Sequence, residues 1–171
     1  MKRLLAFAPL VALALLAVLF AGYSLKRNPQ IQPAAMVGHP IPDLALPMLE
    51  TGRPVPIRQA ITGPMLVNFY ASWCAPCELE APALMRLKAQ GVTILGVGYK
   101  DAPENNRAFL GRLGDPYALR LLDRDGRAGL EFGVTGVPES YLIDAGGTII
   151  AKYTGELTPP EELEIIAATR R

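Results

Sequence analysis

The chain has 171 residues, half of them hydrophobic, and carries 17 Lys and Arg against 16 Asp and Glu. This length suits one domain of about 100 to 150 residues with a hydrophobic appendage, and it leaves little room for a second domain. The near-neutral charge offers no basic surface for nucleic acid, so nucleic acid is excluded as a partner.

The chain opens with an apolar segment, residues 4–23, that contains no charged residue and no Asn, Gln, Ser or Thr. As a helix it would be about 30 Å long, which matches the hydrocarbon core of a bilayer. We therefore expect residues 1–23 to form a cytoplasmic tip and a single transmembrane signal-anchor that contacts membrane lipid through residues 4–23. The short N-terminal tail favours a cytoplasmic start and an exported domain.

A cleaved signal peptide is the alternative, since Gly22-Tyr23-Ser24 offers a small-x-small cleavage site. The apolar run is longer than the roughly 7 to 15 residues of a signal-peptide core, which favours the anchor. The following residues 24–37 are polar and contain proline, so we expect a tether there. The folded domain should then span residues 38–171.

The first elements of the domain indicate a strand, a helix and a second strand. Residues 65–71 are rich in strand formers and lead directly into a helical pattern that runs from Cys77 to Gly91. Residues 92–99 form the next buried strand. Two strands joined through a helix predict a parallel pair with a right-handed crossover.

A second helix is expected to open at residues 101–103 and to stop at residues 114–116, where Gly-Asp-Pro ends the pattern. Residues 117–122 are a third strand candidate. A turn at residues 123–126 and a connecting segment follow.

The C-terminal part predicts a hairpin and a helix. Residues 140–143 and 148–153 are two strands around a short turn that contains Gly-Gly. Residues 158–161, Thr-Pro-Pro-Glu, are a capping box that starts the last helix, whose expected buried side chains are Leu163, Ile166 and Ala167. The whole pattern predicts an α/β domain with a central mixed β-sheet flanked by helices.

The two cysteines, Cys74 and Cys77, stand three apart where a helix follows a strand. The N–H groups and the partial positive charge of a helix N-terminus stabilise a thiolate, so Cys74 should be nucleophilic near neutral pH. Cys77, one turn on, can resolve the mixed disulfide that Cys74 forms with a substrate. Pro76 fits an early helical position, which does not need the missing N–H.

Two other uses of the cysteines are less consistent with the sequence. A structural disulfide across so short a loop stabilises little through chain entropy. A zinc site needs about four ligands, and beyond the two thiols the chain has a single histidine, His39, in a loop-like stretch. We therefore expect a redox-active disulfide, no metal and no cofactor.

Several segments together resemble a known family. Residues 73–77, Trp-Cys-Ala-Pro-Cys, resemble the thioredoxin active-site pentapeptide, and Val137-Pro138 resembles the cis-proline loop of the thioredoxin fold. Four longer segments are similar to the DsbE/CcmG type of cytochrome c maturation protein: residues 68–74, 98–101, 116–119 and 133–144.

The resemblance implies a thioredoxin-like domain on the periplasmic side of the inner membrane, held by one N-terminal anchor. It implies that the protein reduces the haem-binding cysteines of apocytochrome c, or another cysteine-containing exported protein, and receives electrons from a DsbD-like membrane donor. Copper-site proteins or general disulfides are alternative substrates of the same chemistry. A non-catalytic docking module of a membrane assembly is an alternative of a different class.

The resemblance also implies roles for residues around the dithiol. Glu80 and Glu139 match acidic positions of the DsbE type, and we expect both to lie near the dithiol and to raise the pKa of the Cys74 thiol. Many thioredoxins carry a buried aspartate where this chain has Asn68. A solvated surface position is the alternative for the two glutamates.

Two further positions keep alternatives open. Pro138 is expected in the cis form, against an ordinary trans turn, and the Val137 backbone would then pair with an extended substrate peptide. Trp73 is either a partly exposed shield beside the sulfurs or an ordinary core residue.

Overall fold

The computed structural model describes residues 8–24 and 36–170, and the chain divides into two compact units, residues 1–33 and residues 34–171. Helix α2, Ala8–Ser24, is the described element of the first unit. Among the described residues, no helix combines the length and the apolarity needed to cross a membrane. Residues 4–7 of the expected anchor and residues 25–35 of the expected tether lie outside the described part.

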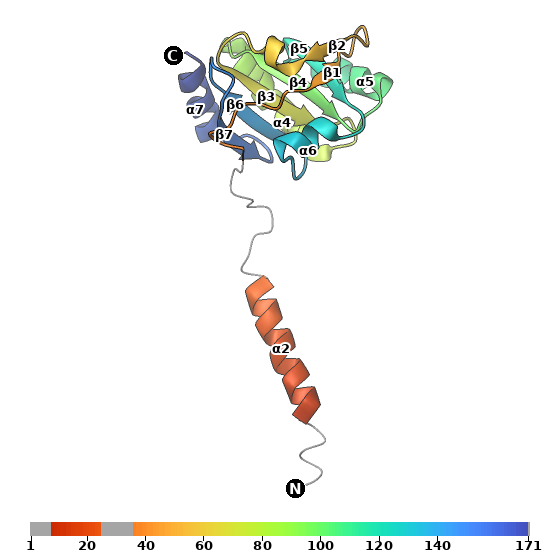
Figure 1. Ribbon diagram of the computed structural model, residues 1–171, viewed down its shortest axis with the longest axis vertical. Helices are drawn as coiled ribbons and strands as arrows, with labels where there is room; N and C mark the ends of the chain where they lie inside the picture. The colour runs from red at the N-terminus through yellow and green to blue at the C-terminus, as the bar shows by residue number, and fades with distance from the viewer. Residues whose placement is uncertain (1–7, 25–35, 171) are drawn as a thin grey trace. The chain divides into compact units, whose positions relative to one another are not determined.

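The second unit is built on a five-stranded sheet with the strand order β5-β4-β3-β6-β7 (Figure 1). The strands are β3 (Met65–Tyr70), β4 (Ile94–Tyr99), β5 (Leu119–Asp123), β6 (Glu139–Ile143) and β7 (Ile149–Thr154). β3 pairs parallel with β4 and antiparallel with β6, and β6 pairs antiparallel with β7. The predicted mixed sheet, its parallel crossover and its C-terminal hairpin are confirmed.

Helices cover both faces of this sheet. The helices are α3 (Ile57–Ala60), α4 (Ala75–Ala89), α5 (Pro103–Leu113), α6 (Arg127–Phe132) and α7 (Pro159–Thr169). Side chains of α4, α5 and α7 pack in one buried cluster with Leu66 and Tyr70 of β3. Side chains of α3 and α6 pack in the other with Val67 and Phe69. Because successive side chains of a strand point to opposite faces, one central strand contributes to both clusters.

Four short elements were not predicted. β1 (Ala45–Pro47) and β2 (Pro54–Pro56) form an antiparallel hairpin followed by α3, and the expected connecting segment contains α6. Strand β5 also begins two residues later than residue 117, where the sequence placed its start. Tyr117 is instead a buried core residue before the strand, and its ring lies against the backbone of Gly96 in β4.

Helix α7 starts with the predicted capping box, in which the hydroxyl and backbone N–H of Thr158 both donate to the carboxylate of Glu161. Its expected buried face is wrong at two of three positions, because Leu163 is 69% exposed and Ala167 is exposed. Ile166 is half-buried and packs against the core, and Ile165, which was not expected, is fully buried. Glu162 faces the domain because its carboxylate binds the guanidinium of Arg86 on α4, with a closest N–O distance of 2.6 Å.

Candidate active site

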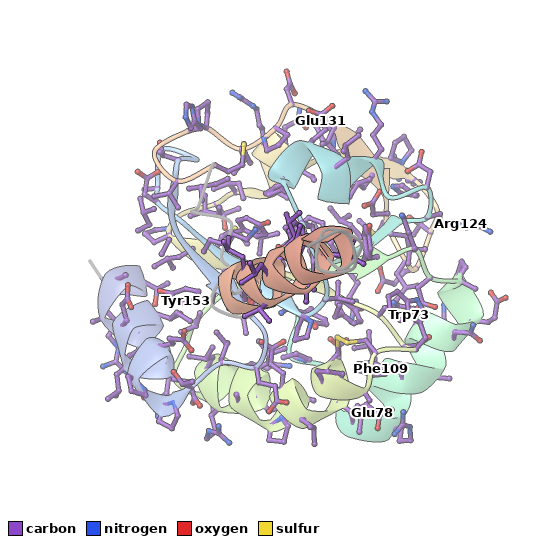
Figure 2. All side chains as sticks on the ribbon, turned by 90° about the horizontal axis from the view of Figure 1, so that it is seen from below. Trp73, Glu78, Phe109, Arg124, Glu131 and Tyr153 are labelled. Carbon is purple, nitrogen blue, oxygen red and sulfur yellow. A yellow bond between two sulfur atoms is a disulfide. The ribbon has the colours of Figure 1, made fainter. Side chains whose placement is uncertain are left out.

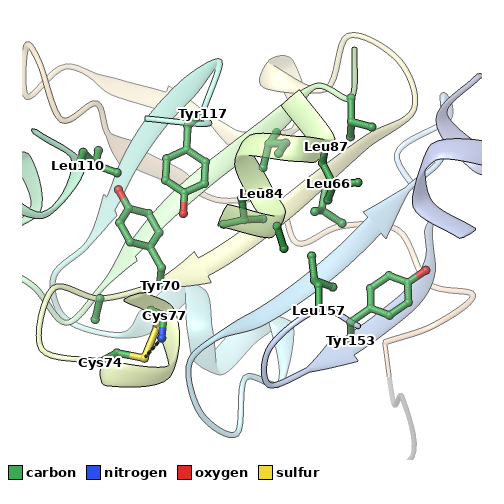
Figure 3. Close-up of a cluster of buried hydrophobic side chains, with 14 of the residues drawn as sticks. Leu66, Tyr70, Cys74, Cys77, Leu84, Leu87, Leu110, Tyr117, Tyr153 and Leu157 are labelled. Carbon is green, nitrogen blue, oxygen red and sulfur yellow. Dashed lines mark hydrogen bonds between the residues drawn. A yellow bond between two sulfur atoms is a disulfide. The ribbon is translucent and has the colours of Figure 1, made fainter. Parts of the chain in front are cut away.

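The dithiol lies at the junction of a buried strand and a helix. After β3 ends at Tyr70, a short turn brings Cys74 to the N-cap position of α4. Cys74 and Cys77 form a disulfide, with 5.3 Å between their Cα atoms. The backbone N–H of Cys77 donates to Cys74 Sγ across 3.2 Å, as drawn in Figure 3. The same amide also donates to the Cys74 carbonyl oxygen across 3.1 Å. The helix N-terminus therefore directs an N–H group at the sulfur that we expect to ionise.

The surface beside this disulfide is apolar. The cysteines themselves are buried, with Cys74 4% exposed, whereas Pro76 is exposed and Leu79 protrudes from the same helix. Trp73 is 60% exposed, so core packing is wrong for this residue (Figure 2). Its indole N–H donates to the Lys100 carbonyl oxygen across 3.3 Å, which holds the ring at the edge of the site.

The loop before β6 closes the other side of the disulfide. The Val137–Pro138 peptide bond is cis, so the structure does not contain the trans turn that was the alternative. The carbonyl oxygen of Val137 lies 3.3 Å from Cys74 Sγ. Pro138 is buried and Val137 is half-buried. A peptide carbonyl and a sulfur atom that lie 63 residues apart in the sequence are thus neighbours at one edge of the sheet.

Glu80 is a buried acid, 1% exposed, so a solvated surface position is wrong for it. It lies one turn beyond Cys77 on α4, and the Asn68 amide nitrogen donates to its Oε2 across 2.9 Å. Its Oε1 has no hydrogen-bond partner among the described residues. Burial raises the pKa of Glu80 to about 8, and the hydrogen bond from Asn68, together with the nearby backbone of Leu157, opposes that rise.

Asn68 holds this acid within a buried polar network. Its second amide hydrogen points to Ser140 Oγ at 3.0 Å, and its carbonyl oxygen accepts from the Tyr117 hydroxyl at 2.7 Å. The amide therefore has a partner for both hydrogens and for its oxygen, which fixes the orientation of its side chain. Where a thioredoxin has an acid on the strand, this chain has an amide there and a carboxyl group on the adjoining helix.

Glu139 has a different environment from the one expected. In the pairing of β3 with β6, Asn68 lies opposite Ser140 and Phe69 opposite Glu139, so the Glu139 side chain is on the other face of the sheet from Asn68. Its buried carboxylate lies 3.1 Å from the Lys152 ammonium and accepts hydrogen bonds from nearby residues, namely Thr135 and Tyr141. None of its described contacts reaches a cysteine, and Lys152 compensates its charge.

A second polar network was missed by the sequence analysis, which gave Asp101 only the role of a helix start. Asp101 follows β4 and binds Ser72, two residues before Cys74. The carboxyl ends of parallel strands meet at one edge of a sheet, so an acid after β4 lies beside the loop after β3. That rule was the signal available in the sequence.

The site has the groups needed for thiol–disulfide exchange, and its described side chains show no arrangement that would bind a metal. Within residues 8–24 and 36–170, no three His, Cys, Asp or Glu side chains are grouped to hold a metal ion. His39 is exposed in the loop before the sheet. The groups present support attack by a sulfur that a helix amide stabilises, followed by displacement by its neighbour one turn away.

Comparison with known proteins agrees with this geometry. Residues 36–168 match the family model described as Redoxin. The thiol:disulfide interchange protein HelX of Rhodobacter capsulatus is 38% identical over 161 residues, covering 92% of this chain and 90% of that protein. The thiol:disulfide interchange protein DsbE of Escherichia coli K12 is 38% identical over 167 residues, covering 93% and 89%.

The fold agrees as well. A crystal structure of a thio-disulfide isomerase from Thermus thermophilus superposes with a TM-score of 0.63 at 26% identity, covering 75% of this chain and 92% of that one. The domain is thus thioredoxin-like, with its disulfide at the position from which α4 begins. On its sequence, its fold and its Cys74–Cys77 pair, the chain belongs to the Redoxin family and is a thiol:disulfide oxidoreductase of the DsbE type.

Proposed function

We propose that the protein is a membrane-anchored periplasmic dithiol reductant that reduces the haem-binding cysteines of apocytochrome c. The observation that carries the proposal is the pair of backbone groups around Cys74 Sγ: the Cys77 amide at 3.2 Å and the Val137 carbonyl at 3.3 Å. The amide stabilises a thiolate. The loop that carries the carbonyl is half-exposed and suits an extended peptide that carries the target disulfide.

The proposed reaction transfers two electrons from the dithiol to the substrate. The Cys74 thiolate attacks one sulfur of a substrate disulfide, and the other substrate sulfur leaves as a thiolate that takes up a proton. The Cys77 thiol then loses its proton and attacks Cys74 Sγ, so the second substrate thiol is released and the Cys74–Cys77 disulfide forms. A dithiol donor, for which we propose a DsbD-like membrane protein, restores the reduced form by the reverse exchange.

Glu80 is the proposed proton acceptor of the second step. A carboxyl group whose pKa is about 8 holds and releases a proton near neutral pH, which is the range that general acid–base catalysis needs. Its position one turn beyond Cys77 supports exchange with the buried thiol, directly or through water. Once ionised, Glu80 would also oppose a thiolate and so favour the oxidised protein. Glu139, neutralised by Lys152, contributes less to this effect than Glu80 does.

The apolar surface of Trp73 and Pro76 beside Cys74 supports contact with an unfolded or extended protein partner rather than with a small, strongly polar thiol. Apocytochrome c is the proposed substrate because the DsbE/CcmG resemblance covers the segments on both sides of the disulfide. Cysteine-containing copper-site proteins remain a second candidate, because the same exchange would serve them.

The proposed location follows from the N-terminal unit. Residues 1–23 would be the cytoplasmic tip and signal-anchor in the inner membrane, residues 24–37 the tether, and residues 38–171 the periplasmic domain. The uncharged apolar run over residues 4–23 supports this assignment. Alkaline carbonate extraction of membranes tests it: an anchored chain stays in the pellet, whereas a chain released by cleavage after residue 24 moves to the supernatant.

Trapping tests the substrate. In a Cys77→Ala variant, the mixed disulfide between Cys74 and the substrate cannot be resolved, so it should accumulate and be released by dithiothreitol. Expression in cells that make c-type cytochromes should yield apocytochrome c in the adduct, and a Cys74→Ala variant is the matched control. A copper-site protein in the adduct would change the substrate, and no reducible adduct at all would favour a docking module.

A further inference from the structure

Asp101 is a buried carboxylate that accepts four hydrogen bonds. Its Oδ1 accepts from the Ser72 hydroxyl and from the Ala102 N–H, both at 2.9 Å. Its Oδ2 accepts from the Ser72 N–H at 2.8 Å and from the Asn106 side-chain amide at 3.2 Å. None of the ion pairs among the described residues includes Asp101. Because a buried charge without a cation is costly, these four donors must stabilise it.

These hydrogen bonds connect two loops at the edge of the sheet. Ser72 donates to Asp101 through both its backbone and its hydroxyl, and the next residue, Trp73, donates to the carbonyl of Lys100. Three hydrogen bonds therefore join residues 72–73, which lead into Cys74, to residues 100–101, which lead into α5. The turn that precedes Cys74 is therefore held by residues outside α4.

The Asp101 carboxylate is itself held in place by side chains of α5 and β3. The Asn106 side chain that donates to Asp101 accepts from the Tyr70 hydroxyl across 2.6 Å. The Tyr70 ring stacks on that of Tyr117 with 4.7 Å between centroids, and Gly98 leaves room for Asn106, because a Cβ there would lie 2.5 Å from its amide nitrogen. Asp101 therefore has little freedom to move with the loop that it holds.

We infer that Asp101 is a positioning residue of the dithiol: its carboxylate holds Ser72 so that the Cys74 sulfur stays opposite the Cys77 amide. The inference rests on the proposed reductase function and deepens it. Two effects of removing the carboxylate oppose each other. Loss of its negative charge alone would lower the pKa of the Cys74 thiol, whereas loss of the loop anchor weakens the amide contact that stabilises the thiolate and raises that pKa.

The sign of the change therefore tests the inference. We propose Asp101→Asn, which places an N–H group against at least one of the present donors, and Ser72→Ala, which removes only the hydroxyl hydrogen bond and leaves the charge in place. Asp123→Asn is the matched control. Asp123 is also a buried carboxylate, and it accepts backbone hydrogen bonds from Ala128 and Gly129 in α6 instead of from the dithiol loop.

Each change is made in the full chain, in mild detergent, on a Cys77→Ala background so that Cys74 is the only thiol. The rate of alkylation by iodoacetamide is measured against pH, and its midpoint gives the pKa of Cys74. The other ionisable side chains at this end of α4 are the same in all variants, namely Glu78, Glu80, Lys100 and Arg112. Thermal unfolding of each variant is measured alongside.

We expect Asp101→Asn to move the midpoint upward by about one pH unit, which is a tenfold loss of thiolate below the midpoint. Ser72→Ala should move it upward by less, and Asp123→Asn should leave it unchanged. A downward or absent shift in Asp101→Asn overturns the inference, as does an equal shift in Asp123→Asn. If Asp101→Asn does not fold, an unchanged midpoint in Ser72→Ala overturns it. Failure of the parent to alkylate at all would instead refute the proposed function.

Discussion

Replacing Glu80 by glutamine should stabilise the oxidised protein near neutral pH, and by more as the pH rises further. The pKa of Glu80 is raised from 4.5 to about 8 by burial. Between these two values the folded protein holds a proton that the unfolded chain has released, so rising pH favours unfolding. Glutamine cannot ionise and does not have this dependence. The difference in unfolding free energy between the variant and the parent should therefore grow with pH over this window.

The size of the effect follows from the two pKa values. The unfolding free energy of the parent falls by at most about 1.4 kcal/mol per pH unit because of Glu80. By pH 7 this loss amounts to about 3 kcal/mol as an upper figure. The substitution also has a cost, because the glutamine amide nitrogen would lie at the position of Oε1, which has no hydrogen-bond partner among the described residues. An unsatisfied buried donor costs about 1 to 3 kcal/mol. The net gain at pH 7 is then about 1 kcal/mol, whereas near pH 5 the variant should be the less stable protein.

Urea unfolding of the oxidised proteins at several values between about pH 5 and about pH 8 measures the difference directly. Glu78→Gln is the control on the same helix, because Glu78 is solvent-facing and Arg112 lowers its pKa. That variant should not gain stability with pH. Parallel stability curves for Glu80→Gln and the parent would refute the argument, since they would mean that Glu80 ionises alike in the folded and unfolded states.

Two predictions concern packing. Gly96→Ala should destabilise the domain by about 1 to 3 kcal/mol in urea unfolding, because its Cβ would lie 2.6 Å from the Tyr117 ring; an unchanged midpoint would contradict the close contact. Ile165→Ala should cost about 2 to 5 kcal/mol, whereas Leu163→Ala should change stability by less than about 0.5 kcal/mol. A larger loss of stability in Leu163→Ala than in Ile165→Ala would mean that α7 buries Leu163, as the sequence predicted.

The sequence predicted the sheet well where two signals agreed. The buried runs that became β3 and β4 are continuous and apolar, and the hairpin of β6 and β7 has a turn of glycines between two strand-forming runs. The three-residue strands β1 and β2 each contain proline and have too few residues to show a period, so no pattern could reveal them. The six residues of α6 are too short for a helical repeat for the same reason.

The side-chain environments were harder to predict, and α7 and Glu80 show why. Leu163 and Ile165 are both apolar, so hydrophobicity alone does not tell which of them faces the domain, and the ion pair of Glu162 with Arg86 forms only in the folded domain. Glu80 is a residue type that is rarely buried. It lies at helical spacing between Cys77 and Leu84, both buried, and this spacing was the available hint. Its partner Asn68 comes from another element, so tertiary contact decides its burial.

The central position of β3 bears on how the protein survives repeated oxidation and reduction. β3 is hydrogen-bonded on both edges, to β4 and to β6, and it delivers the chain directly to Cys74. Amides of such a strand exchange with solvent hydrogen only through openings close to global unfolding. The loop of residues 71–74 therefore starts from the most slowly opening part of the molecule. Both cysteines lie beyond the end of β3, so the disulfide can form and break while the strand keeps its hydrogen bonds to both neighbours.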